Sequence, residues 1–339
     1  MVNTSVVAKL ALSGFAVALL VAFHAQEQHE RQQLIRRNLK SLFQDPHTLT
    51  RKTNNNIDNN YDNNNINNNG GRTGIADGCY HVYLDVGSNI GVHARFLFES
   101  HLYPNAVNAH NVFNTYFGTP ADRSNHDICI FAFEPNPAHR ERLELLQKVY
   151  NGAGWRFHVY MVGVGASDGS MAFYHQPNDE QNSEWGFGTT ATHKQNSKLV
   201  EIPVMDLTQW IETEIMNRQM PEGVHGNYEK TGGAKVVMKL DIEGQEYLVI
   251  PKLMFSNVLC RTVDYVFTEE HPGFFQFTGD PSLLSLGIQN QDDAQVYWNN
   301  IIAAFNSYKK TSPQCRTTIE MMDDESYHTD GVEGGLIPV

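Results

Sequence analysis

A glycine-rich turn preceded by an acidic residue is the first group of residues in this chain that can do chemistry. Residues 84–91 read Leu-Asp-Val-Gly-Ser-Asn-Ile-Gly, with Asp85 near the end of an apolar run. Gly87 and Gly91 permit positive backbone dihedrals and let the main chain approach a ligand closely. A dinucleotide site prefers Gly-x-Gly-x-x-Gly beneath a pyrophosphate, which the carboxylate of Asp85 would repel. Asp85 and Asn89 instead favour a ligand with a cationic centre, although another doubly wound domain could also contain such a turn.

Two later apolar segments also end in acidic residues. Residues 128–137 form an apolar run that is closed by Glu134 and two prolines, which is typical of a strand buried on both faces. Glu134 can accept hydrogen bonds from both hydroxyls of a ribose, or it can start the next helix, as Asn136 also can. Asp168 ends a strand expected over residues 157–168, where it either reaches an adenine amine or forms an ordinary Asp-Gly turn.

The strand expected at residues 236–240 is followed by two carboxylates, Asp241 and Glu243. Carboxylates at such a position are costly if buried and unpaired, so they need a cation, a metal or a substrate hydroxyl as partner. Lys239 is one available cation. A divalent metal is another, and it would lie between Asp241, Glu243 and Glu270 because hard cations prefer carboxylate oxygens. No dense ligand motif supports that alternative, so the sequence predicts no metal site.

One more apolar run, residues 263–268, precedes His271. We expect the ends of these strands to meet at one edge of a parallel sheet, where open α/β folds bind ligands. Asp241, Glu243 and His271 are therefore the candidates for a general base. His271 is the one whose unperturbed pKa lies near neutrality.

Taken together, these segments resemble the FkbM-type methyltransferases. The resemblance implies a class I fold, with a doubly wound, Rossmann-like α/β sheet that is mostly parallel. It also implies methyl transfer from S-adenosyl-L-methionine to an oxygen, often a sugar or polyketide hydroxyl. Within residues 79–275 the matching strings are Asp85-Val-Gly-Ser-Asn-Ile-Gly91, Phe133-Glu-Pro-Asn-Pro137, Val164-Gly-Ala-Ser-Asp-Gly169, Gly186-Phe-Gly-Thr-Thr190, Ile202-Pro-Val-Met-Asp206, Lys239-Leu-Asp-Ile-Glu-Gly-Gln-Glu246 and Glu270-His271.

The resemblance also assigns roles to single residues. It places Glu134 on the ribose and Asp168 near the adenine, and it places four residues around the methionine moiety: Asp85, Gly87, Asn89 and Gly91. The expected acceptor is a small molecule or glycan with a hydroxyl group. A noncatalytic module that binds a glycan or a protein on the same fold is the alternative. A nicotinamide oxidoreductase is disfavoured by the glycine spacing.

The expected catalytic domain spans residues 79–331. One of its segments departs from the family pattern, and another is expected to complete the sheet. Residues 101–127 form an insertion that either covers the pocket, binds a partner or is a disordered surface loop. Residues 294–309 have the spacing of a helix, and residues 317–322 and 326–328 are expected to be closing strands. We expect an antiparallel strand in this C-terminal region, followed by a tail over residues 332–339.

The N-terminal part of the chain concerns location rather than chemistry. Residues 1–24 contain an apolar stretch that approaches the roughly 20 residues needed to cross a bilayer. It is either a signal anchor or a cleaved signal peptide, and the large Phe23 near the expected cleavage position favours the anchor. Residues 25–78 form a stem whose Asn-rich tract buries too little apolar surface to fold. The chain is therefore predicted to be a single-pass membrane protein.

The net charge, the order of the segments and the cysteines bear on the partners and the cellular compartment of the protein. A formal net charge of −13 argues against nucleic acid as a partner, because a phosphate backbone requires a basic surface. The order of anchor, stem and domain favours the lumen of the Golgi or ER, whereas the basic residues at 31–40 favour the cytosol, so the orientation stays open. Cys79 and Cys129 precede neighbouring strands and are either a disulfide or two buried thiols. Cys260 and Cys315 are a weaker pair.

Overall fold

The computed structural model describes residues 74–175, 187–189, 198–271, 284, 286–322 and 335–336. The predicted anchor, the Asn-rich tract and the expected strand at 326–328 lie outside these residues, as do most of the stem and tail. Within the described ranges, no helix is both long enough and apolar enough to cross a membrane.

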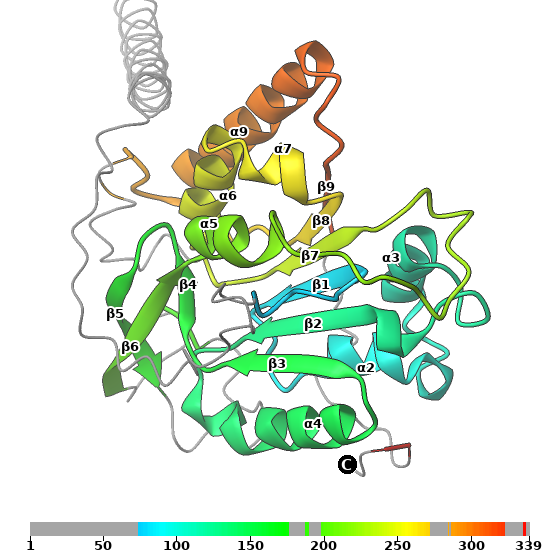
Figure 1. Cartoon of the computed structure of the whole chain (residues 1–339). Helices are drawn as coiled ribbons and strands as arrows, with labels where there is room; N and C mark the ends of the chain where they lie inside the picture. The colour runs from blue at the N-terminus through cyan, green and yellow to red at the C-terminus, as the bar shows by residue number, and fades with distance from the viewer. Residues whose placement is uncertain are drawn as a thin grey trace, which may run out of the picture.

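A parallel sheet of six strands forms the centre of the domain (Figure 1). Its order is β3-β2-β1-β7-β8-β9, and all five neighbouring pairs are parallel. Every residue of β1, β2, β7 and β8 is buried, because helices cover both faces. The mostly parallel, doubly wound sheet predicted from the apolar runs is confirmed. The strands are β1 (His81–Val86), β2 (Ile128–Phe133), β3 (Arg156–Tyr160), β7 (Val236–Leu240), β8 (Tyr265–Thr268) and β9 (Thr318–Met321).

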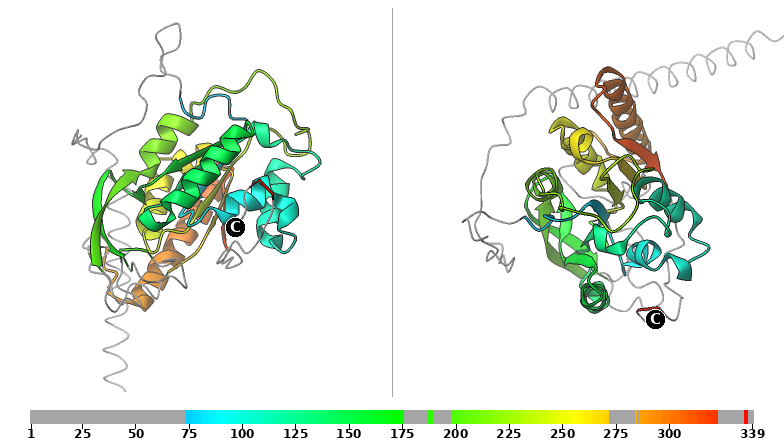
Figure 2. Two further views of the ribbon diagram at one scale, coloured as in Figure 1. Left: turned by 90° about the horizontal axis from the view of Figure 1, so that it is seen from below. Right: turned by 45° about the vertical axis from the view of Figure 1, so that its right-hand side comes forward.

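Helices form a layer on each face of this sheet (Figures 1 and 2). Each face of the sheet has its own hydrophobic core, and alternate residues of β1 point to different faces. Tyr83 packs against one helical layer, whereas Val82 and Leu84 pack against the other. The first layer consists of α2 (Val92–Phe98), α3 (Val107–Phe117) and α4 (Arg140–Gly152). The second consists of α5 (Leu207–Trp210), α6 (Glu246–Phe255), α7 (Val258–Thr262) and α9 (Gln291–Thr311). Short helical turns complete the chain at η1 (Ser100–Leu102), η2 (Asn125–Asp127), η3 (Pro137–His139) and η4 (Ile211–Ile215).

A second, smaller sheet lies beside the carboxyl ends of the central strands (Figure 1). It consists of β4 (Gly163–Gly165), β6 (Lys198–Asp206) and β5 (Gly169–His175), in that order. The strand expected over residues 157–168 is therefore two strands, since β3 belongs to the central sheet and β4 to the small one. Gly165 permits this packing, because a Cβ there would lie 2.7 Å from a methyl group of Val204.

The antiparallel pairing of the described chain is found in this small sheet, between β5 and β6. It was expected near the C-terminus instead. The C-terminal strand that the structure describes, β9, pairs with β8 in the parallel sense. The reason is that α9 separates the two strands, and a helical crossover returns the chain to the same direction.

The insertion at residues 101–127 is part of the core rather than a surface loop. It contains α3, whose residues Phe113 and Phe117 are fully buried. The ring of Phe113 packs edge-on against Tyr83 of β1, with ring centroids 5.1 Å apart. The helix lies at the end of the domain opposite the small sheet (Figure 2, left). It therefore does not cover the carboxyl ends of the strands.

Two disulfides connect elements that are distant in the sequence. Cys79 bonds to Cys129, and Cys260 bonds to Cys315. The first links the segment before β1 to β2, and the second links α7 to the segment before β9. The segment just before Cys79 already belongs to the folded domain, because the guanidinium of Arg156 donates hydrogen bonds to the carbonyls of Ile75 and Asp77. The domain therefore extends to Gly74 at least, beyond the predicted boundary at residue 79.

Candidate functional site

A pocket opens between the carboxyl edge of the central sheet and the small sheet. It encloses about 660 Å³ of free space, including its open mouth. The ends of β1, β2 and β7 meet there, at the point where the strand order reverses from β1-β2-β3 to β7-β8-β9. Open α/β sheets bind ligands at this position. The lining residues are Gly87, Asn89, Phe133, Glu134, Pro135, His139, Val162, Gly163, Val164, Phe173, Phe187, Asp241, Ile242, Glu243 and Gln245.

The turn after β1 depends on Gly87. Its φ is 81°, and a Cβ at this position would lie 1.7 Å from the carbonyl oxygen of Asp241. The backbone segments after β1 and β7 thus lie so close together that no residue with a Cβ fits at position 87. Asn89 also has a positive φ, 52°, and its side-chain oxygen accepts a hydrogen bond from the backbone N–H of Ile90 at 2.7 Å.

Replacing Gly87 with alanine is expected to lower the free energy of unfolding by at least about 2 kcal/mol. The added methyl group meets a backbone oxygen, and φ is unfavourable for alanine. Urea denaturation of the variant measures this loss. Gly169→Ala is the matched control, because an added Cβ there meets nothing within 4 Å. Equal stability of the two variants would contradict this account of the turn.

Glu134 connects the turns that follow β1 and β2. One carboxylate oxygen accepts a hydrogen bond from the N–H of Asn89 at 2.7 Å, and the other accepts one from the N–H of Asn136 at 2.8 Å. The imidazole of His139 lies 3.3 Å from the second oxygen. Asn136, the alternative helix start, caps η3 by accepting from the N–H of Ala138. Glu134 thus lies at the pocket as predicted for a ribose ligand, and it is already held in place by the backbone.

Three of the residues predicted to bind the cofactor do not line the pocket. Asp85 is fully buried within β1, where the hydroxyl of Tyr83 lies 3.3 Å from its carboxylate. Gly91 packs on α4, and a Cβ there would lie 2.4 Å from a methyl group of Leu146. Asp168 is exposed, and its carboxylate accepts a hydrogen bond from the N–H of Asp206. The chain bends at residues 166–168 just before β5, so Asp168 lies at the turn that was considered as its alternative role.

Burial raises the pKa of Asp85 to about 7, against the opposing effect of the Lys239 ammonium. The folded protein thus keeps a proton on Asp85 between about pH 4 and pH 7, where the unfolded chain has released it. We expect the free energy of unfolding to fall over this interval in the natural protein. In Asp85→Asn this part of the pH dependence should be missing. Urea denaturation at several pH values measures the free energy of unfolding of both proteins. If it depends on pH in the same way in both, the raised pKa of Asp85 is contradicted.

Asp241 forms an ion pair with the buried side chain of Lys239. The ammonium lies 2.9 Å from one carboxylate oxygen and donates a second hydrogen bond to the carbonyl of Gly87 at 2.7 Å. Burial opposes ionisation of Asp241, but Lys239 and His271 outweigh it and lower the pKa of this carboxyl group. The structure therefore brings Asp241 to the pocket together with the cation that the sequence offered.

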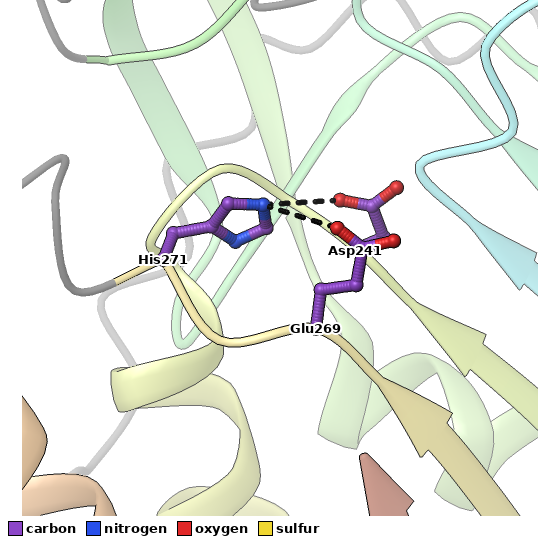
Figure 3. A group of neighbouring side chains, drawn as sticks. All are labelled: Asp241, Glu269 and His271. Atoms are coloured by element: carbon purple, nitrogen blue, oxygen red, sulfur yellow. Dashed lines mark ion pairs between the residues drawn. The ribbon is translucent and has the colours of Figure 1, made fainter. Parts of the chain in front are cut away.

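Carboxylates lie near both ring nitrogens of His271, and Figure 3 shows two of them, those of Asp241 and Glu269. Its Nε2 lies 3.6 Å from Asp241 and 3.6 Å from Glu269, and its Nδ1 lies 3.3 Å from Glu246. Burial alone would lower the pKa of His271, but the carboxylates of Glu246, Glu243 and Asp241 raise it well above its ordinary value. With a proton bound to it, the imidazole has no basic nitrogen near neutral pH. The reason for choosing His271 as the general base, its pKa near neutrality, does not hold in the folded protein.

Glu243 lines the pocket from the loop after β7. Its φ of 58° is rare for a residue that is not glycine, and such conformations persist where the surrounding structure holds them. The main chain approaches closely at this point, because a Cβ at Gly188 would lie 2.8 Å from the Cβ of Glu243. The loop thus fixes the backbone of a carboxylate-bearing residue in the pocket wall.

Several pocket residues were not among the predicted site residues. His139 lies two residues after the Phe-Glu-Pro-Asn-Pro string, and its contact with Glu134 is local enough for the string to have suggested it. The apolar wall formed by Val162, Phe173 and Phe187 gives no such signal, because it depends on the small sheet folding over the strand ends. Glu270 was considered as a metal ligand, but its carboxylate accepts a hydrogen bond from Gln295.

Comparisons with known proteins give no argument about the fold or the function. No family model matches the sequence. No curated protein matches it either. A solved structure, the methyltransferase FkbM from Methylobacillus flagellatus KT, aligns with 15% sequence identity and a TM-score of 0.25. The alignment covers 52% of this chain and 29% of that chain. A similarity this distant carries no argument about activity, so the functional case depends on the residues of the pocket.

Proposed function

We propose that this protein is an S-adenosylmethionine-dependent O-methyltransferase of FkbM type, which acts on a hydroxyl of a glycan or a related small metabolite. One observation supports this most strongly: a pocket at the switch point of a doubly wound sheet combines the carboxylates of Glu134, Asp241 and Glu243 with an apolar wall. The choice of acceptor depends on the resemblance of the sequence to the FkbM family.

The chemistry of the pocket fits the proposed donor. Glu134 offers carboxylate oxygens at the end of β2, where the two hydroxyls of a ribose can bind, and Phe133 and Val164 offer apolar surface to a base. At the other side of the pocket, Asp241 and Glu243 provide negative charge that favours a cationic ligand. We therefore assign the donor to Glu134, Asn89 and the turn at Gly87.

When bound, S-adenosylmethionine supplies an electrophilic methyl group on a sulfonium centre. The part left to the chain is to align the acceptor and to take up the proton that its hydroxyl releases. Asp241 is a weak proton acceptor because Lys239 lowers its pKa. Glu243 lines the same pocket two residues later. We therefore assign the proton transfer to Glu243, and we assign to Asp241 the task of holding Lys239 and the Gly87 turn in position.

Calorimetric titration of the full chain with S-adenosylmethionine, its demethylated product and NAD tests the proposal. We expect the first two ligands to bind with one-to-one stoichiometry and NAD to show no saturable heat. Binding of NAD alone would support an oxidoreductase. If none of the three ligands binds, the proposed function fails and the alternative of a noncatalytic module gains support.

We further propose that the domain is tethered to a membrane by its N-terminal segment and faces the lumen of the Golgi or ER. Two disulfides in the described domain support an oxidising compartment, because cytosolic thiols are kept reduced. Protease protection of the domain in sealed microsomes tests this orientation. Digestion of the domain without detergent would contradict it.

A further inference from the structure

We propose that Asp241, Glu269 and His271 form a binding site for one divalent transition-metal ion. These residues come from the ends of two neighbouring strands, β7 and β8, and each offers one donor atom to a common centre (Figure 3). The three donor atoms lie within 4.8 Å of one another. The sequence alone predicted no metal site.

The spacing of the donor atoms suits a small ion. The Nε2 atom of His271 lies 3.6 Å from an oxygen of Asp241 and 3.6 Å from an oxygen of Glu269. Two ligands that are each about 2.1 Å from one ion, at an angle of about 110°, are separated by about 3.4 Å. A shift of a few tenths of an ångström therefore brings each of these two pairs to coordination distance, and the third pair, Asp241 and Glu269, lies within 4.8 Å.

The second nitrogen of His271 is held in a way that is typical of metal sites. Its Nδ1 lies 3.3 Å from the carboxylate of Glu246. That carboxylate is itself fixed by the backbone N–H groups of Ile242 at 2.6 Å and Gly244 at 2.8 Å. A histidine that binds a metal usually donates its other N–H to such an oriented carboxylate, which sets the ring direction. The ion then takes the place of the proton on Nε2, which is released to solvent on binding.

The charge around the cluster also favours a cation. The carboxylates of Asp241, Glu243, Glu246 and Glu269 surround the ammonium of Lys239 and the imidazole of His271. In this largely buried region acidic groups thus outnumber basic ones, and desolvated negative charge is costly unless it is balanced. A divalent ion between Asp241 and Glu269 reduces that imbalance.

The mixed donor set indicates the class of metal. One imidazole and two carboxylates suit Mn²⁺, Fe²⁺, Co²⁺ or Zn²⁺, whereas Mg²⁺ and Ca²⁺ prefer oxygen ligands alone. Asp241 also lines the large pocket, and together with Glu269 it lines a second, smaller cavity. An ion here therefore has open space beside it for an exogenous ligand. If the proposed function is correct, that ligand is an oxygen of the acceptor.

Titration of the full chain with Co²⁺, after treatment with a chelator, tests the site without any measurement of activity. We expect visible absorption bands that saturate at one equivalent of Co²⁺. The bands should disappear when Zn²⁺ is added but persist at the same concentration of Mg²⁺. Glu269→Gln should weaken Co²⁺ binding at least about tenfold, a loss typical of altered metal sites. Glu270→Gln is the matched control and should bind as the natural protein does, because its carboxylate contacts Gln295 instead.

The outcomes separate the metal site from the proposed function. If the natural protein shows no saturable binding, or if both glutamine variants bind Co²⁺ equally well, the cluster is an ion-pair network and the proposal is wrong. Glu246→Gln gives a second test, with an expected loss of about 10- to 100-fold through the orientation of His271. If Co²⁺ binds as expected and S-adenosylmethionine does not bind, the metal site stands and the methyltransferase proposal fails.

Discussion

Replacing Glu243 with glutamine is expected to lower the rate of methyl transfer by about 10²- to 10⁴-fold, the range that a positioned general base contributes. Glutamine keeps the size of the side chain and cannot accept the proton at neutral pH. Glu243 lines the pocket wall, in a loop that holds φ at 58°. The measurement is the single-turnover transfer of a labelled methyl group at saturating donor and acceptor.

The affinity for the donor shows whether this loss is chemical or structural. The dissociation constant for S-adenosylmethionine should rise far less in Glu243→Gln than the rate falls, because Asp241 keeps a negative charge near the sulfonium and Glu134 still holds the ribose. Glu212→Gln is the control, since Glu212 is an exposed residue of η4 outside the pocket. A variant at Glu243 with full turnover would remove this residue from the mechanism.

Removal of the disulfide between Cys79 and Cys129 is expected to lower the free energy of unfolding by about 4 kcal/mol. The bond closes a loop with a sequence separation of 50 residues, and a loop of this length restricts the unfolded chain by about that amount. The effect is measured by urea denaturation of Cys79→Ala/Cys129→Ala under non-reducing conditions.

Reduction of the natural protein provides the control. A reductant should destabilise the natural protein and leave unchanged a quadruple variant in which Cys260 and Cys315 are also alanine. If the double variant is as stable as the natural protein, the two cysteines are better described as buried thiols. The inference of an oxidising compartment would then lose its main support.

The sequence predicted the central sheet well because its strands are buried on both faces. Such strands appear as continuous apolar runs, and those ending at Val86, Phe133 and Leu240 are visible without any structure. The glycine at position 87 was predicted from its turn motif alone, although the carbonyl of Asp241 that excludes any larger residue there could not be. These features are local, so the residue types alone carry them.

The orientation of single side chains was less predictable. Asp85 belongs to β1 itself rather than to the loop after it, so its side chain points into the interior. Asp168 follows a strand that leaves the central sheet, which no apolar pattern indicates. The contact of His271 with Glu246 joins the loop after β8 to the first residue of α6. Together with the carboxylates of Glu243 and Asp241, it reverses the expected charge state of the imidazole.

The central claim is that the pocket at the ends of β1, β2 and β7 binds the methyl donor. A crystal structure of the full domain with the demethylated product, S-adenosylhomocysteine, tests it most directly. We expect the ribose hydroxyls on the carboxylate of Glu134 and the sulfur on the side of the pocket formed by Asp241 and Glu243. Electron density for the ligand at any other surface of the domain would contradict the claim.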